Sequence, residues 1–421
     1  MPSSAGRLPA RFGHLPARAA FLLQASIVVS FLAGSSAPTP LYAVYQSQWH
    51  FSAITTTVVF GIYALAVLGA LLFAGSLSDH VGRRPVLLAA ITVQAVTMVV
   101  FARAGGVPQL LVARVLQGLS TGAAIGAVGA GMLDIDKARG TLANAVAPVT
   151  GTAVGALLAG LLVQYLPERT HLVYLVLLTV LALQGTGVLL MSETSSRRPG
   201  ALASLKVQVG LPVQARRPFL LAAPAIVAVW ALAGFYGSLA PALTRHIVGS
   251  TSYALGGLAL FTLAGVGGLT VLLLRTHPPR TVMLFGTTAL IVGVGLTLEA
   301  ITVSSTALFF TGTAVAGAGF GAGFQGAIRS VIPLAAPHER AGVLSLVYVA
   351  SYLAMGLPAV VGGYLVVHGG GLLTTAREYG AAVMVLSLVA LLGLLRKQSE
   401  MPSYQAIPAP AHAQELALTP R

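Results

Sequence analysis

The stretch Gly75-Ser76-Leu77-Ser78-Asp79-His80-Val81-Gly82-Arg83-Arg84-Pro85 decides the fold of this chain. It lies between two long apolar runs, at about residues 54–74 and 86–101. Charged side chains are costly inside a lipid bilayer, so the charges of this stretch must lie at a membrane surface. The stretch therefore predicts a turn at which one membrane helix ends and the next begins.

The composition of the whole chain indicates that lipid is its solvent. Of its 421 residues 56% are hydrophobic and only 8% are charged, too few polar groups for a water-soluble surface. The formal net charge of +14 does not indicate nucleic acid, because the Lys and Arg residues are scattered in short loops and form no continuous basic face. The chain has no cysteine, which excludes disulfides and thiolate metal sites. We expect the lipid bilayer as a partner and no nucleic acid.

Twelve apolar runs are long enough to cross the roughly 30 Å hydrocarbon core of a bilayer, which takes about 20 helical residues. We predict spans at 19–46, 52–76, 86–103, 108–132, 141–165, 170–191, 218–244, 253–275, 281–300, 306–332, 341–367 and 372–396. The first run resembles a cleaved signal peptide in its flanks, but we interpret it as an uncleaved first helix. The predicted fold class is an all-α membrane protein with twelve transmembrane helices in two pseudo-symmetric six-helix halves.

Orientation and domain organisation follow from the loops. With both termini in the cytoplasm, the outer side carries only Arg103, Arg169, Arg245 and Arg377 among the loop Lys and Arg residues, as the positive-inside rule requires. Ala33-Gly34 followed by Pro38 and Pro40 is repeated as Ala233-Gly234 followed by Pro241, which supports two related halves. We predict a cytoplasmic N-terminus (1–18), an N-terminal half (19–191), a cytoplasmic central loop (192–217), a C-terminal half (218–396) and a disordered cytoplasmic tail (397–421).

Three motifs resemble the major facilitator superfamily. Gly75, Leu77, Asp79, Gly82, Arg83 and Arg84 resemble the loop between the second and third helices of that family, with His80 as a departure. Arg114-Val115-Leu116-Gln117-Gly118 resembles its fourth-helix motif R-x-x-Q-G. The glycine-rich stretch Gly151 to Gly160 resembles the fifth helix of the twelve-helix drug/proton antiporter branch, although Ala156 replaces a proline of that motif. The resemblance implies a secondary transporter that alternates between inward-open and outward-open states.

The charged stretch is a candidate conformational latch at the inner membrane surface. The resemblance implies that its members stabilise the outward-open state, with Asp79 facing the amino end of the eleventh helix. The alternative is a set of solvated charges that only obey the topology rule. The predicted latch residues are Gly75, Asp79, Gly82, Arg83, Arg84 and Asp134.

Polar and aromatic side chains within the spans are candidates for the transport path, because polar amides in spans rarely face lipid. The predicted path residues are Gln24, Arg114, Gln117, Tyr236 and Gln325, with Trp230, Phe235, Phe324 and Tyr348 as further aromatic contacts. Arg114 is expected to face the central cavity or a neighbouring helix end, and the alternative is snorkelling to the outer surface. Pro38 and Pro40 are expected to interrupt the first helix and leave carbonyls without helical donors.

Glycines repeat at four-residue spacing and allow helices to approach closely. Two interpretations stay open: a sliding surface between the rocking halves, and ordinary packing of small residues. The predicted packing residues are Gly118, Gly122, Gly126, Gly151 and Gly155.

The function that we expect is proton-coupled export of small amphipathic compounds by a monomer in a bacterial inner membrane. Because no acid lies at the middle of a span, Asp79, Glu299 and Glu378 are the candidate proton carriers, and coupling through Arg114 or no coupling at all are the alternatives. The alternatives are uptake or exchange of a sugar or organic acid, with Arg114 as countercharge, and a transporter-like sensor that moves nothing. We expect no metal, no cofactor beyond a proton gradient, and no enzyme, because phosphate loops, zinc clusters and nucleophile elbows do not occur in a suitable context.

Overall fold

The structure, a computed structural model, describes residues 15–168, 170–196, 198–207, 209–250 and 252–396. The predicted disordered tail and most of the predicted N-terminal segment lie outside the described residues. The described part of the chain consists of helices joined by short loops and contains no strand.

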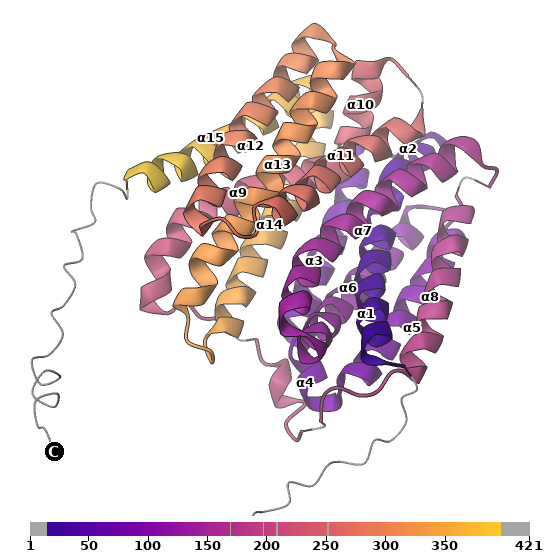
Figure 1. Cartoon of the computed structure of the whole chain (residues 1–421). Coiled ribbons are helices and arrows are strands. Elements are labelled where there is room, and N and C mark those ends of the chain that lie inside the picture. The colour runs from indigo at the N-terminus through magenta and orange to yellow at the C-terminus, as the bar shows by residue number, and fades with distance from the viewer. Residues whose placement is uncertain (1–14, 169, 197, 208, 251, 397–421) are drawn as a thin grey trace, which may run out of the picture.

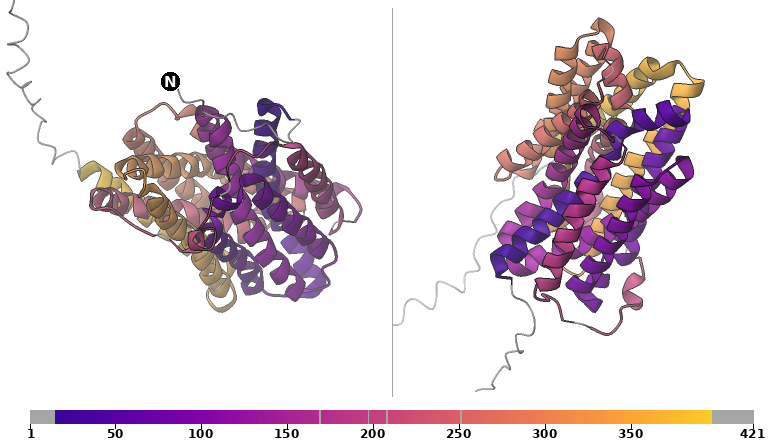
Figure 2. Two further views of the ribbon diagram at one scale, coloured as in Figure 1. Left: turned by 90° about the horizontal axis from the view of Figure 1, so that it is seen from below. Right: turned by 90° about the vertical axis from the view of Figure 1, so that its right-hand side faces the viewer.

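The helices form two groups that lie side by side in Figure 1, and Figure 2 shows the same two groups from below and from the side. The first group comprises α1 (Ala17–Ser36), α2 (Pro38–Trp49), α3 (Ala53–Ala74), α4 (Leu77–Val81), α5 (Arg83–Ala102), α6 (Val107–Ile135), α7 (Lys137–Tyr165) and α8 (Leu172–Leu190). The second group comprises α9 (Val213–Ser238), α10 (Ala240–Val248), α11 (Tyr253–Leu273), α12 (Pro279–Val303), α13 (Thr306–Val331), α14 (Arg340–His368) and α15 (Gly371–Arg396). Short 3-10 turns follow at Ala203–Leu205 and Ile332–Leu334. The two groups meet along their length, with α3 against α14 and α7 against α11.

Twelve helical segments of the described chain are long and apolar enough to cross a membrane, and each overlaps one predicted span. The predicted all-helical fold with twelve spans is therefore confirmed. The first span consists of α1 and α2 together, and α9 is continued by α10 after a single intervening residue.

Both breaks lie where the sequence places proline. The helix α1 ends at Ser36 and α2 begins at Pro38, which confirms the predicted interruption. Because proline has no backbone N–H, the carbonyl four residues earlier loses its helical donor. At the first break this carbonyl belongs to Gly34. At the second break Pro241, the second residue of α10, frees the carbonyl of Gly237 in the same way.

The predicted turn between the second and third spans contains a short helix of its own, α4. Asp79 lies in its first turn, where the helix dipole favours negative charge. The helix ends at Val81 and is followed by Gly82, whose positive φ of 103° favours glycine. The chain thereby reverses within the charged stretch and α5 starts directly at Arg83.

The five predicted packing glycines all lie inside the first group. Gly118 and Gly122 bring α6 against the backbone and alanine side chains of α3, and Gly126 lies against the backbone of Gly75, directly after α3. Gly151 and Gly155 bring α7 against α1 in the same way. Both helix pairs belong to one group, so these glycines pack helices of one group and do not form a sliding surface between the two groups. The structure thus places them as the second interpretation expects.

Candidate functional site

Arg114 and Gln117 of α6 pair with the carbonyls at the first helix break. Gln117 donates through Nε2 to the Gly34 carbonyl, which Pro38 leaves without a helical donor, at 2.9 Å. Arg114 donates through Nη1 to the Ser35 carbonyl at 2.8 Å and to Gln117 Oε1 at 2.6 Å. Buried carbonyls need such partners. The R-x-x-Q spacing therefore places two donors on one face of α6, next to the break.

Three aromatic rings complete the surroundings of Arg114. Its guanidinium carbon lies 5.1 Å from the Tyr63 ring centre, 5.6 Å from that of Tyr42 and 5.9 Å from that of Phe101. Tyr42 also accepts a hydrogen bond from Arg114 Nε at 3.1 Å. Arg114 is 0% exposed, so it neither faces an open cavity nor snorkels to the surface. Of the predicted orientations, the structure shows the one toward a neighbouring helix end, because the guanidinium pairs with the Ser35 carbonyl at the end of α1. The freed carbonyls and the rings hold it inside the first group.

The other predicted path residues likewise make their polar contacts within one group. Gln24 lies in the first group and points its Nε2 at the sulfur of Met191, 3.5 Å away. Gln325 donates to the Val271 carbonyl of α11 at 3.2 Å. Among the described residues, both glutamines leave their buried Oε1 without a hydrogen-bond partner, and their assignment to the transport path stays a prediction.

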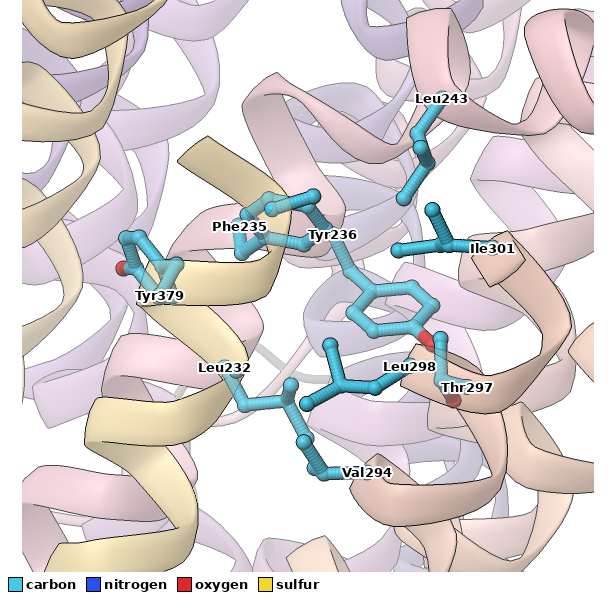
Figure 3. Close-up of a pocket in the computed structure, with 11 residues that line it drawn as sticks. Leu232, Phe235, Tyr236, Leu243, Val294, Thr297, Leu298, Ile301 and Tyr379 are labelled. Atoms are coloured by element: carbon cyan, nitrogen blue, oxygen red, sulfur yellow. The ribbon is translucent and has the colours of Figure 1, made fainter. Parts of the chain in front are cut away.

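Tyr236 lines a small apolar cavity inside the second group, between α9, α12 and α15. Figure 3 shows its ring between Leu298 and Thr297, with Phe235 and Tyr379 on the other side of the cavity. The Tyr236 hydroxyl is 2.8 Å from Thr313 Oγ1. Phe235 and Tyr236 therefore contribute to the interior of the second group and not to the surface between the groups.

The two groups are hydrogen-bonded to each other at the end that carries α2 and α10, which the positive-inside rule predicts to be the outer end. Thr39 of α2 donates through its hydroxyl to the Gly237 carbonyl at 3.1 Å, the same carbonyl that Pro241 leaves without a donor. Gln164 at the end of α7 accepts the backbone N–H of Tyr253, the first residue of α11, at 2.9 Å. Each bond therefore satisfies a helix break or a helix start of the second group with a side chain of the first.

Glycines allow very close approach of the two groups near the same end. A Cβ atom on Gly257 of α11 would overlap the Ala156 carbonyl of α7, and one on Gly363 of α14 would overlap the Thr57 side chain of α3. The absence of a side chain at both glycines is what lets these helices touch. The α2–α10 end is therefore closed in this structure.

Farther from this end, aromatic side chains gather where the two groups meet. Trp230 of α9 lies 5.2 Å from Phe324, 5.3 Å from Tyr352 and 6.5 Å from Phe320, measured between ring centres. Tyr348 lies 6.5 Å from Tyr352. We call these five residues the Trp230 cluster. Sequence reasoning named Trp230, Phe324 and Tyr348. It missed Phe320, four residues before Phe324, and Tyr352, four residues after Tyr348, although side chains four residues apart lie on one helix face.

The Trp230 cluster contacts both groups of helices. Tyr352 belongs to one buried apolar cluster with Phe60, Tyr63 and Val67 of α3, and Trp230 and Tyr348 pack against it. Trp230, Phe324 and Tyr348 are nonetheless partly exposed. Because Tyr63 also faces Arg114, it connects the cluster to the polar network at the first helix break.

The charged stretch forms an ion-pair network inside the first group. Arg83 is buried, pairs with Asp79, and places its Nε 3.3 Å from Asp134 Oδ2. Arg84 takes a different partner and donates to the Leu189 carbonyl at the end of α8. The structure thus brings together three of the predicted latch residues.

Two predicted contacts of the charged stretch differ in the structure. Asp79 pairs with Arg83 four residues away; it was predicted to face the amino end of α14, the eleventh span, and among the described residues no hydrogen bond to that helix end is found for it. Arg83 is close in sequence, so the half-exposed carboxylate of Asp79 pairs with this neighbour. Gly75 takes no part in the network and instead faces Gly126 of α6 across a close helix contact.

Glu193, which sequence reasoning did not assign to the latch, caps the start of α5. Its carboxylate accepts the backbone N–H of Arg83 at 2.8 Å and that of Arg84 at 3.0 Å. A Cβ atom on Gly82 would lie 2.7 Å from Glu193 Oε2, so glycine leaves room for the carboxylate. The one signal in the sequence is that Glu193 is the single acid of the predicted central loop.

Comparison with known proteins places the fold. The family model described as Major Facilitator Superfamily matches residues 25–277. A crystal structure of a mutant of the nucleoside transporter NupG is similar, with a TM-score of 0.66 over 89% of this chain and 99% of that chain. The two sequences are 13% identical, so this likeness shows the fold alone. No curated protein matches the chain.

Proposed function

Because the chain belongs to the Major Facilitator Superfamily, we propose that it is a secondary active transporter that exports small amphipathic compounds in exchange for protons. The observation that supports transport most directly is the contact between the two groups of helices. They close at the α2–α10 end through two side-chain hydrogen bonds and bare glycines, and the partly exposed Trp230 cluster lies farther along the same contact. Rocking of the two groups would break the contacts at the α2–α10 end and would bury the Trp230 cluster.

The direction of transport and the coupling to protons rest on the resemblance to the drug/proton antiporter branch. That resemblance consists of the glycine-rich stretch Gly151 to Gly160 and the proline pair of the first span. The proposed proton carrier is Asp79, because its carboxylate is linked to Arg83 in the network that surrounds the start of α5. Glu299 and Glu378 are exposed on α12 and α15 and are the second choice. The proposed location is a bacterial inner membrane, with both termini in the cytoplasm and a monomer as the working unit.

The test compares a pump-deficient bacterial host that expresses the native chain with hosts that express Asp79→Asn or Asp136→Asn at equal membrane abundance. Asp136 is the matched control, because it is an acid near the same end of α6 that caps α7 by accepting the Arg139 N–H at 2.9 Å, and asparagine caps equally well. Resistance to lipophilic toxicants that is lost in Asp79→Asn and kept in Asp136→Asn would support proton-driven export.

Proteoliposomes separate the alternatives. We expect proton flux when an exported compound is added to native vesicles under a pH gradient. Accumulation of a sugar, an organic acid or a nucleoside would instead indicate metabolite uptake; the nucleoside is included because the similar solved structure is a nucleoside transporter. A folded protein that moves none of these compounds would favour the sensor.

A further inference from the structure

Trp230 carries a buried hydrogen-bond donor without an acceptor. Its Nε1 is inaccessible to solvent and has no hydrogen-bond partner among the described residues. Buried donors are nearly always paired, so an unpaired one in a packed bundle needs a specific explanation. In a transporter, the explanation with a clear advantage is an acceptor that arrives on the transported compound, because the donor then contributes to binding without first breaking another bond.

The rings around Trp230 favour a planar partner. Phe324 meets the indole edge-on, with ring planes at 81°, and Tyr352 is tilted by 41°. These side chains present broad apolar area with fixed ring planes, and stacking against such rings stabilises aromatic ligands. A flexible aliphatic compound would gain less from the same surface.

The helices that carry or contact the cluster provide no charged side chain to pair with a charged compound. Four stretches contain no Asp, Glu, Lys, Arg or His: residues 53–78 around α3, 218–244 around α9, 306–328 in α13 and 341–367 in α14. An anion would find no free countercharge, because Arg114 is already surrounded by its own carbonyls and rings. A cation could rest on the rings, but it would leave the Trp230 N–H without an acceptor.

We propose that the Trp230 cluster binds an uncharged, planar aromatic compound that places a carbonyl oxygen or ring nitrogen against Trp230 Nε1. This inference rests on the proposed transport function and specifies its substrate class. Phe320, Phe324, Tyr348 and Tyr352 provide the apolar surface, and Trp230 provides both a ring and the polar contact.

Four naphthalenes of nearly equal shape test the proposal: 2-naphthamide, which is uncharged and has an acceptor; naphthalene, which lacks the acceptor; 2-naphthoate, an anion; and 2-naphthylmethylammonium, a cation. Their binding to the purified full chain in detergent is measured by equilibrium dialysis. Trp230→Phe keeps a ring and removes the N–H. Trp49→Phe is the matched control, because Trp49 stacks on Tyr45 in α2 and is the only other tryptophan.

We expect the native chain and Trp49→Phe to bind the amide roughly tenfold more tightly than the hydrocarbon, and more tightly than either ion. In Trp230→Phe the preference for the amide over the hydrocarbon should disappear, with helicity unchanged by circular dichroism. The amide and the hydrocarbon partition differently into micelles, which affects their apparent affinity ratio on any one protein. This effect is the same for both variants. The decisive quantity is therefore the difference in the amide-to-hydrocarbon affinity ratio between Trp230→Phe and Trp49→Phe.

The proposal is overturned if either ion binds as tightly as the amide, if the amide does not bind at all, or if its preference survives in Trp230→Phe. Proteoliposome transport of the same compounds distinguishes this failure from failure of the proposed function. Transport of an ion alone would leave the function standing and reject the substrate class. Binding of the amide without transport of any compound would reject the proposed transport function and would leave the binding site for an uncharged aromatic compound standing.

Discussion

The role of Gln117 at the first helix break gives the sharpest prediction. Gln117→Leu keeps the size of the side chain but removes the donor to the Gly34 carbonyl and the acceptor for Arg114. Pro38→Ala restores a backbone N–H at the position that would pair with the Gly34 carbonyl in a continuous helix. Ala37 already has helical φ and ψ of −54° and −40°, so the restored N–H lies close to the required geometry. With the proline replaced, the backbone can donate to the Gly34 carbonyl, so the hydrogen bond from Gln117 to this carbonyl should no longer be needed.

The magnitude follows from the two contacts. A buried carbonyl left unpaired costs about 1–3 kcal/mol, and a hydrogen bond to a charged group contributes about 1.5–3 kcal/mol. We therefore expect Gln117→Leu alone to lower the free energy of unfolding by about 4 kcal/mol. In the Pro38→Ala background the carbonyl is satisfied by the backbone, so the same substitution should cost about 2 kcal/mol. The coupling energy of the double-mutant cycle is then about 2 kcal/mol.

The assay is unfolding in mixed micelles titrated with sodium dodecyl sulfate and followed by circular dichroism. Gln184→Leu serves as the control, because buried Gln184 bonds to the hydroxyls of Ser30 at 2.8 Å and Ser26 at 3.1 Å and to no carbonyl freed by proline. Its cost should be the same with and without Pro38. If Gln117→Leu costs as much in the Pro38→Ala background as in the native chain, Gln117 does not compensate for the missing proline donor.

Three further predictions concern the closed end and the charged stretch. Thr39→Val removes the hydroxyl that donates to the other group of helices. It should raise the rate of thiol labelling of a Ser238→Cys reporter by roughly fivefold, because the chain has no other cysteine to react. An unchanged labelling rate would show that this hydrogen bond does not hold the α2–α10 end closed. Gly257→Leu places a side chain where α7 and α11 touch, and should raise labelling of the same reporter further, whereas slower labelling would contradict the closure described here. Gly82→Ala forces alanine into φ 103° and against Glu193, and should lower the free energy of unfolding by about 1–2 kcal/mol, more than Glu193→Gln, which keeps the shape and loses about 0.5–1 kcal/mol.

The features that were predictable from sequence depend on short segments of chain. Each span follows from about 20 consecutive apolar residues, whatever its neighbours are. The break at Pro38 follows from one missing backbone donor. The reversal at Gly82 follows from a glycine between charges that cannot enter lipid.

The features that were not predictable depend on which helix faces which. The sequence marks Arg114 as a buried charge, but only the packing of α6 against the first break shows that its partners are the Ser35 carbonyl and Tyr42. Glu193 is a loop acid until the fold brings it 2.8 Å from the N–H of Arg83. The sequence shows that a buried polar or charged residue needs a hydrogen-bond or ion-pair partner, and the tertiary structure determines which residue that partner is.

The two helix breaks differ in which group supplies the partner of the freed carbonyl, and the proposed alternating transport gives that difference a consequence. At the first break the freed Gly34 carbonyl is paired by Gln117, a residue of the same group, so the bond can persist while the groups move. At the second break the freed Gly237 carbonyl is paired by Thr39 of the other group, so opening of the α2–α10 end must break the bond and expose the carbonyl to water. Water then satisfies the carbonyl, which keeps the net cost of opening near that of one ordinary hydrogen bond, about 1 kcal/mol. A bond of this strength biases the closed state by roughly fivefold without locking it, as the proposed alternation between two states requires.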